Sequence, residues 1–243
     1  MFGVQGRTIA SVTLRATMGR RRALLFALPA LILIVVTLLI KLSHPPDPTW
    51  PAQVLGIFGF SVVLPLTALI IGTSVLGAEV DDGSIVQLLA TPVPRSVVIA
   101  SKYAVATVLT MIFVAIPVLL AGVIATGGLT KLAAGLFVGA LAGSVMYNAV
   151  FVMLSVVTTR AIAFGLLYVL IWESLLTNFV SGAKLLSIGH YSLGVADTIA
   201  HDSNLNAGLS AGTAIPMGAI VTAAALVVAA RALASFSLKG DAI

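Results

Sequence analysis

Long apolar segments alternate with short polar ones along the whole chain. A membrane-spanning helix needs roughly 20 mostly apolar residues. Six segments meet this requirement: residues 23–40, 54–78, 103–126, 132–157, 161–180 and 211–230. The pattern predicts an all-α integral membrane protein with six transmembrane helices, folded as a single membrane domain over residues 1–243.

The composition supports this interpretation and excludes two other classes. Of the 243 residues, 60% are hydrophobic and 9% are charged, whereas a soluble domain carries about 25% charged residues. A soluble enzyme and a disordered chain are both excluded. The chain contains no cysteine, so disulfides, thiolate metal sites and a cysteine nucleophile are excluded too.

The basic residues flank the apolar segments and predict an orientation. With a cytoplasmic N-terminus, ten of the 13 Lys and Arg residues lie inside and three, Lys41, Lys131 and Lys184, lie outside. Basic residues gather on the cytoplasmic side of membrane proteins. The distribution therefore predicts that both termini are cytoplasmic. The net charge of +5 is explained by basic residues that flank the membrane spans. No nucleic-acid partner is therefore expected.

An arginine-rich stretch, residues 7–22, precedes the first apolar segment. It alternates basic and apolar residues, which is typical of a helix lying on the inner membrane surface near anionic lipid headgroups. A simple basic anchor is the alternative. The stretch is long and no small-residue cleavage site follows, so we expect a retained first helix rather than a signal peptide.

The fourth apolar segment carries a stripe of small residues, Gly135, Gly139 and Gly143. Glycines at four-residue spacing let another helix approach closely. Packing within one bundle and contact between subunits both remain open.

The loop after the second segment, residues 79–102, has its own helical pattern. Acidic residues and Ser84 precede an apolar run, which is a helix start. Ile85, Leu88 and Leu89 then form one apolar face, and Pro92 ends the helix. The loop therefore predicts a short amphipathic cytoplasmic helix.

This loop resembles the signature loop of ABC-2-type transporter permeases. The resemblance implies a membrane subunit of an ATP-driven exporter, in which the loop helix docks on a separate nucleotide-binding subunit. Ser84 stands where Thr is commoner in the family, and Pro94 where a small polar residue is usual. The residues that would carry the coupling role are Glu79, Asp82, Gly83, Ser84, Ile85, Leu88, Leu89, Thr91, Pro92, Arg95 and Lys102.

The resemblance also implies partners. The sequence contains no Gly-Lys pair and hence no phosphate-binding P-loop. ATP and Mg would therefore be bound by two copies of a partner ATPase, next to a second permease chain, identical or homologous. This chain is expected to hold no cofactor, metal or catalytic residue. The alternative for the loop is an interfacial helix that only anchors the bundle.

Two polar residues interrupt the apolar segments. Glu173 would lie roughly 18 Å deep, counted from the cytoplasmic end of the fifth segment. Substrate contact, a structural hydrogen bond to Asn148 or to a backbone carbonyl, and proton relay remain open for it. Trp172-Glu173 also resembles a family feature. Asn148 is favoured as a link between helices, and both residues are candidates for the translocation path.

The longest outer segment, residues 181–210, is too apolar for a free loop. Short helices on or dipping into the outer leaflet are expected, similar to the external helices of the family. His190, Asp197 and His201 would share one helical face, as metal ligands do. Two glycines argue against a continuous helix there, so metal binding is disfavoured.

Together these features predict a multi-pass permease subunit in a bacterial cytoplasmic membrane. The nearly uncharged bundle suits a hydrophobic or amphipathic substrate such as a drug, a lipid or a peptide. The alternative is an ATP-independent membrane scaffold or channel. A channel usually shows a polar stripe along several helices. An intramembrane enzyme would need a nucleophile motif or paired acids, which the sequence lacks.

Overall fold

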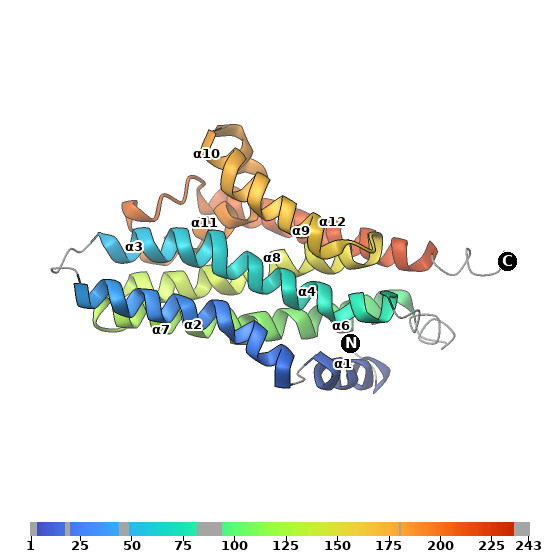
Figure 1. The fold of residues 1–243 in the computed structure, drawn as a ribbon. Helices are drawn as coiled ribbons and strands as arrows, with labels where there is room; N and C mark the ends of the chain where they lie inside the picture. Colours follow the sequence, from blue (N-terminus) through green and yellow to red (C-terminus); the bar gives the residue numbers. More distant parts are fainter. Residues whose placement is uncertain (1–3, 18–19, 44–48, 82–93, 180, 236–243) are drawn as a thin grey trace.

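A computed structural model describes residues 4–17, 20–43, 49–81, 94–179 and 181–235 of the chain. These parts contain helices and turns and no β-strand. The helices run mostly side by side and form an elongated bundle (Figure 1).

Five helices are long and apolar enough to cross a membrane. They correspond to the first four predicted segments and the sixth. Two of them contain a stretch of wide π-helical turns. In chain order their elements are α2 (Arg20–Ser43); α3 (Trp50–Val54), η1 (Leu55–Val63) and α4 (Leu64–Asp81); α6 (Arg95–Thr110), η2 (Met111–Ala115) and α7 (Ile116–Thr126); α8 (Lys131–Val157); and α12 (Ala211–Ser235).

The fifth predicted segment is helical but differs from the others. It consists of α9 (Ala161–Leu167), the π-helical η3 (Tyr168–Leu176) and the single turn α10 (Thr177–Phe179). Its apolar part extends only from Ala161 to Glu173, which is short for a full crossing. The segment leans away from the bundle (Figure 1). The all-helical membrane fold is confirmed with five long spans, and a sixth crossing stays a prediction.

The wide turns in the second and third spans have a cause in the sequence. Pro65 and Pro117 are each the second residue after a π-helical stretch. Proline has no N–H, so it cannot bond the carbonyl four residues earlier. Hydrogen bonds one residue wider accommodate that gap. The prolines therefore introduce wide turns at η1 and η2 and leave both helices continuous.

The two described ends of the chain lie at the same end of the bundle. The N-terminal helix α1 (Val4–Thr17) and the last turns of α12 are both there, next to the end of α4 and the start of α6 (Figure 1). Helix α1 packs against α6 and α4. The predicted surface helix at residues 7–22 corresponds mainly to α1, which ends at Thr17, and α2 starts at Arg20. Helix α1 and the start of α2 belong to the end of the bundle that the basic residues predict to be cytoplasmic, and a position of α1 on the membrane surface stays a prediction.

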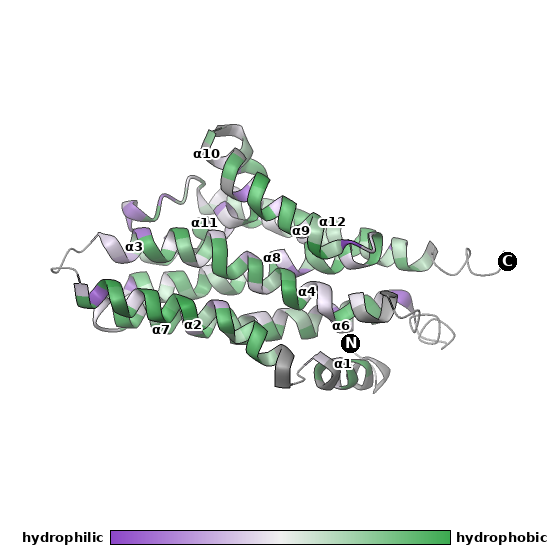
Figure 2. Cartoon of the chain, viewed as in Figure 1, coloured by the Kyte–Doolittle hydropathy of each residue, from purple (hydrophilic) through white to green (hydrophobic). Residues whose placement is uncertain are grey.

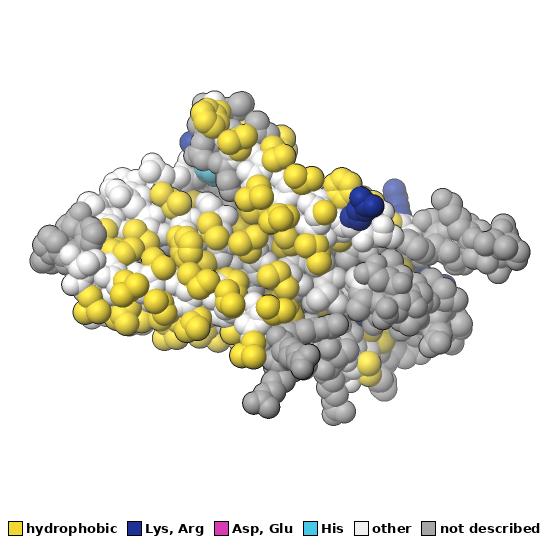
Figure 3. All heavy atoms as spheres, viewed as in Figure 1, with side chains coloured by type: hydrophobic (Ala, Val, Ile, Leu, Met, Phe, Trp, Pro, Cys, Tyr) yellow, Lys and Arg dark blue, Asp and Glu magenta, His cyan; other side chains and the backbone are white. Residues whose placement is uncertain are grey.

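The outer surface of the bundle is apolar. Large side chains that are more than half exposed include Leu24 and Ile57 at 67% and 68%, and Ile220 at 61%. Hydrophilic stretches are concentrated towards the ends of the helices (Figure 2), and yellow hydrophobic side chains cover the middle of the visible face (Figure 3). An apolar surface of this extent is expected for a protein surrounded by lipid.

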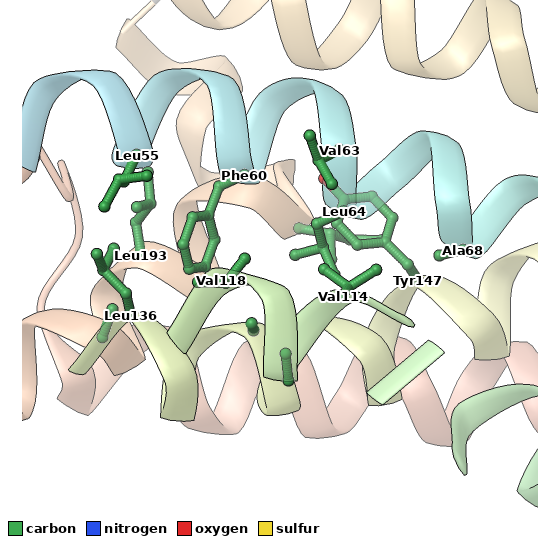
Figure 4. Close-up of a cluster of buried hydrophobic side chains, with 14 of the residues drawn as sticks. Leu55, Phe60, Val63, Leu64, Ala68, Val114, Val118, Leu136, Tyr147 and Leu193 are labelled. Carbon is green, nitrogen blue, oxygen red and sulfur yellow. The ribbon is translucent and has the colours of Figure 1, made fainter. Parts of the chain in front are cut away.

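The interior is packed around the second span. Phe60 and Leu64 point toward Val114 and Val118 of the third span, and Tyr147 of α8 lies beside them (Figure 4). A second cluster fills the other half of the bundle, around Phe26, Ile71, Val98, Leu109 and Val152. These contacts hold the helices that flank the loop at residues 82–93 against α8.

Candidate functional site

The predicted coupling helix lies outside the described residues. This applies to Asp82, Gly83, Ser84, Ile85, Leu88, Leu89, Thr91 and Pro92. Glu79 is in the last turns of α4, and Arg95 is the first residue of α6. The structure therefore places the two helices that enter and leave the loop, and the helix within the loop stays a prediction.

Lys102 joins these two helices. Its side chain is 1% exposed, and Nζ donates a hydrogen bond to the carbonyl oxygen of Val75 in α4 at 2.8 Å. A buried ammonium group is costly unless it is hydrogen-bonded. The lysine therefore ties α6 to α4 a few turns from the loop. The sequence identified Lys102 only through the family resemblance and gave no sign of its burial.

Glu173 is the second charged residue that is buried in the described spans, and it lies inside η3. Its side chain is 6% exposed, and its carboxylate faces the start of α11 (Ile188–Ala200). The backbone N–H of Ile188 donates to Oε1 at 2.8 Å, and that of Gly189 donates to Oε2 at 3.3 Å. Ser187 Oγ donates to Oε2 at 2.5 Å, and the Tyr168 hydroxyl to Oε1 at 2.9 Å.

This arrangement makes Glu173 a cap for a helix that follows later in the chain. The first N–H groups of a helix have no partner within it, and the helix dipole favours negative charge there. The Glu173 carboxylate supplies acceptors and charge, while Ser187, the N-cap residue, accepts a hydrogen bond from the His190 N–H at 3.1 Å. Glu173 therefore links η3 to the start of α11.

The observed partners differ from those expected. Among the described residues, neither Asn148 nor a backbone carbonyl bonds the Glu173 carboxylate; its partners are two backbone N–H groups and two hydroxyls. The sequence does indicate one of these four partners, the Tyr168 hydroxyl. Tyr168 lies inside an apolar segment, and a buried tyrosine hydroxyl usually finds a hydrogen-bond partner.

Gly189 allows the carboxylate to approach. A Cβ on this residue would lie 3.0 Å from Glu173 Oε2 and 3.3 Å from the Tyr147 hydroxyl oxygen. The Tyr147 hydroxyl is itself buried and has no hydrogen-bond partner in the described part of the chain. A side chain at position 189 would push into this polar cluster, so the glycine keeps the start of α11 close to Glu173.

Ser187 and His190 are in contact, but not in the arrangement of a serine nucleophile with a histidine base. The single hydroxyl hydrogen of Ser187 is directed at Glu173, so His190 Nδ1, 3.0 Å from Ser187 Oγ, is the donor in that contact. A base that activates serine must accept its proton. Burial, and secondarily the nearby Lys184 ammonium, lower the pKa of His190, so its neutral form is favoured at pH 7. The cluster links η3 to the start of α11, and His190 is not placed to act as the base for Ser187.

Asn148 connects three parts of the bundle. It is fully buried, and Nδ2 donates to Thr110 Oγ1 of α6 at 2.9 Å and to the Ser144 carbonyl at 2.7 Å. A Cβ on Gly72 of α4 would lie 3.2 Å from its Oδ1. These contacts match a link between helices, and the role of Asn148 in a translocation path stays a prediction.

The glycine stripe of α8 lies against α11 of the same chain. A Cβ on Gly135 would meet the Ala196 carbonyl oxygen at 2.5 Å, one on Gly139 the Ser192 carbonyl oxygen at 2.7 Å, and one on Gly143 the Ser192 hydroxyl at 2.6 Å. The structure thus places the stripe in an intramolecular contact.

The outer segment contains the expected helices, but its main helix is largely buried. Besides α11 it contains η4 (Ser181–Leu186) and η5 (Ser203–Leu205). The two glycines do not interrupt the helix, since α11 includes both, but the helix ends at Ala200 and leaves His201 as its C-cap residue. Gly189 faces Glu173, and a Cβ on Gly194 would meet Leu209 and Ala214. Within the described ranges, no group of three or more His, Cys, Asp or Glu residues is placed to hold a metal ion.

The fold and these contacts define a multi-pass helical membrane protein. A family model described as "ABC-2 family transporter protein" matches residues 18–201, about three quarters of the chain. The chain belongs to this family, so the resemblance of the loop is confirmed at family level. A comparison with curated proteins finds no match.

Proposed function

We propose that the chain is the permease subunit of an ATP-driven exporter in a bacterial cytoplasmic membrane, with both termini on the cytoplasmic side. Two copies of a partner ATPase would bind ATP and Mg, and a second permease chain, identical or homologous, would complete the path. The family match over residues 18–201, which includes the loop, is the observation that carries this proposal.

The geometry around the loop supports the coupling role. Helices α4 and α6 enter and leave the loop, and the buried Lys102 bonds one to the other. The same helices pack against α8 and, at their inner ends, against α1. A push on the loop by a partner would therefore reach the spans through packed contacts rather than through a free linker.

The substrate class follows from the bundle. Apart from Glu173 and Lys102, the buried side chains of the described spans carry no charge. Such an interior suits a hydrophobic or amphipathic drug, lipid or peptide better than an ion or a sugar.

Co-purification tests the proposal. The tagged chain is extracted gently from native membranes, and its stoichiometric partners are identified by mass spectrometry. We expect a P-loop ATPase and, in a heteromeric complex, a second six-span chain. Recovery of the chain alone from several mild detergents would contradict the proposal and favour a scaffold or channel.

A variant of the loop sharpens this experiment. Replacing Leu88 and Leu89 by Asp should reduce the recovered ATPase at least tenfold while membrane insertion is retained, because the apolar face of the predicted helix is lost. The matched control is the exposed pair Leu185 and Leu186, 46% and 61% exposed, at the other side of the predicted topology. The coupling assignment fails if both double variants retain the ATPase equally.

A further inference from the structure

A cavity of about 610 Å³ lies between α2, α4, α8 and the start of α9. The start of α9 lies towards the end of the bundle that holds both described chain ends (Figure 1). The volume of the cavity is in the range of pockets that hold small molecules. None of the predicted path residues, Glu173 or Asn148, lines it.

One side of the cavity is polar. Arg160 lies at its rim, next to Thr158 and Thr159, and Ser74 and Ser155 contribute hydroxyls from α4 and α8. No ion pair joins Arg160 to another described residue, and its side chain is exposed. A guanidinium group in this position can bind a phosphate or carboxylate with two hydrogen bonds.

The hydroxyls around it are oriented to accept. Ser74 Oγ donates to the Ile71 carbonyl at 2.8 Å, and Ser155 Oγ to the Val152 carbonyl at 2.7 Å. Each has used its hydrogen within its own helix and has lone pairs left. They suit a headgroup that brings hydrogen-bond donors of its own, such as glycerol hydroxyls or an ammonium group.

The other side of the cavity is apolar and faces the lipid. Leu25 and Phe26 of α2 and Ile162 of α9 line it. Leu25 and Ile162 are 56% and 63% exposed, so the apolar wall continues onto the outer surface of the bundle.

We propose that this cavity binds the headgroup of an inner-leaflet amphipath, whose phosphate pairs with Arg160 and whose hydroxyl or ammonium donors bond the surrounding Ser and Thr oxygens. Its acyl chain would run along Leu25 and Ile162 into the membrane. Basic pockets between membrane helices on the cytoplasmic side bind acidic lipid headgroups in this way. The placement of the site at the inner leaflet rests on the orientation in the proposed function.

Lipid binding by the purified full-length chain tests the site. Native mass spectrometry counts the lipids retained from phosphatidylglycerol and from phosphatidylcholine with the same acyl chains. Phosphatidylglycerol offers net negative charge and hydroxyl donors, and phosphatidylcholine offers neither. We expect preferential retention of phosphatidylglycerol, and roughly tenfold weaker binding of it by Arg160→Gln. Arg231→Gln, an exposed arginine on α12 that does not line the cavity, is the matched control and should bind as the unaltered chain does.

A second variant fills the cavity and leaves the charge of Arg160 unchanged. Gly77 lines the cavity, and a Cβ there would meet no atom within 4 Å. Gly77→Leu should therefore fold normally and should lower retention of both lipids. Equal retention of phosphatidylglycerol by the unaltered chain, Arg160→Gln and Gly77→Leu would overturn the proposal.

Two further experiments test whether the cavity is occupied by a lipid, by a free phosphate or by a second copy of the chain. Glycerol phosphate has the headgroup without acyl chains, so it should fail to compete if the apolar wall contributes to binding. Full competition would show a site for a free phosphate and overturn the lipid assignment.

Because the chain contains no cysteine, an Ile162→Cys variant reports contact with a second copy. Efficient disulfide cross-linking between chains at this position would show that a partner chain closes the cavity, and would also overturn the proposal.

The lipid site and the permease assignment can fail separately. Loss of the ATPase in co-purification, together with binding that depends on Arg160, would leave the site standing and remove the permease assignment. Recovery of an ATPase partner, together with lipid binding that does not depend on Arg160, would keep the permease assignment and remove the lipid site.

Discussion

At the scale of single residues, the main polar groups of the described spans hold helices together. Glu173 bonds the first N–H groups of α11, Lys102 bonds a carbonyl of α4, and Asn148 bonds α8 to α6. The sequence could show that Glu173 and Asn148 were unusual in their apolar segments, and it identified Lys102 only through the family resemblance. It could not show the partners, because these lie 15 to 38 positions away along the chain.

Replacing Glu173 by Gln tests the cap. The amide places a donor near the N–H groups of α11 and removes the negative charge, so we expect a loss of roughly 2 kcal/mol of local stability. Hydrogen exchange of the α11 amides measures it. Tyr168→Phe removes one donor and keeps the carboxylate, so it should have a smaller effect.

The same variant separates a structural role from a path role. Altered transport with unchanged exchange in α11 would show that Glu173 contacts the substrate rather than supporting the helix. Faster exchange in α11 with a parallel loss of transport would show the supporting role.

At the scale of elements, α11 explains the glycines of α8. The four-residue spacing predicted a helix contact, and the partner became visible only in the fold. The apolar patterns predicted the long spans well, because lipid requires long apolar helices with internal backbone hydrogen bonds. The fifth segment was less predictable, because its composition gives no sign of the wide turns in η3 or of the contact between Glu173 and α11.

Replacing Gly139 by Ala tests this contact. The new Cβ would lie 2.7 Å from both the Ala196 Cβ and the Ser192 carbonyl oxygen, so α11 has to shift, at a cost of about 1–3 kcal/mol. Thermal unfolding in detergent measures the change. Gly59→Ala is the control, because its Cβ meets nothing within 4 Å. Equal melting temperatures for the two variants would contradict the close packing of α8 and α11.

At the scale of the whole molecule, the position of the chain ends bears on the number of crossings. Both described chain ends lie at one end of the bundle (Figure 1), which favours an even number of passages between its ends. The described residues contain five long spans, which is an odd number. We therefore expect the segment containing α9, η3 and α10 to complete the return, although its apolar part is short.

Single cysteines in this cysteine-free chain measure the topology. We expect an impermeant maleimide to label Leu129→Cys and Lys184→Cys in intact cells, and Ala234→Cys only after the membrane is opened. Labelling of Lys184→Cys only in opened membranes would show that the fifth segment does not cross.

The prolines that follow η1 and η2 have a mechanical consequence. Each of the two helices that flank residues 82–93 contains a stretch of π-helical turns, in which the hydrogen bonds span one residue more than in an α-helix. If such a stretch moves along the helix by one position, the residue it passes turns about the axis by roughly 100° and advances by about 1.5 Å. In the proposed exporter, force from the cytoplasm would travel outward as such a screw motion, with the helices continuous and no hinge loop inside the lipid.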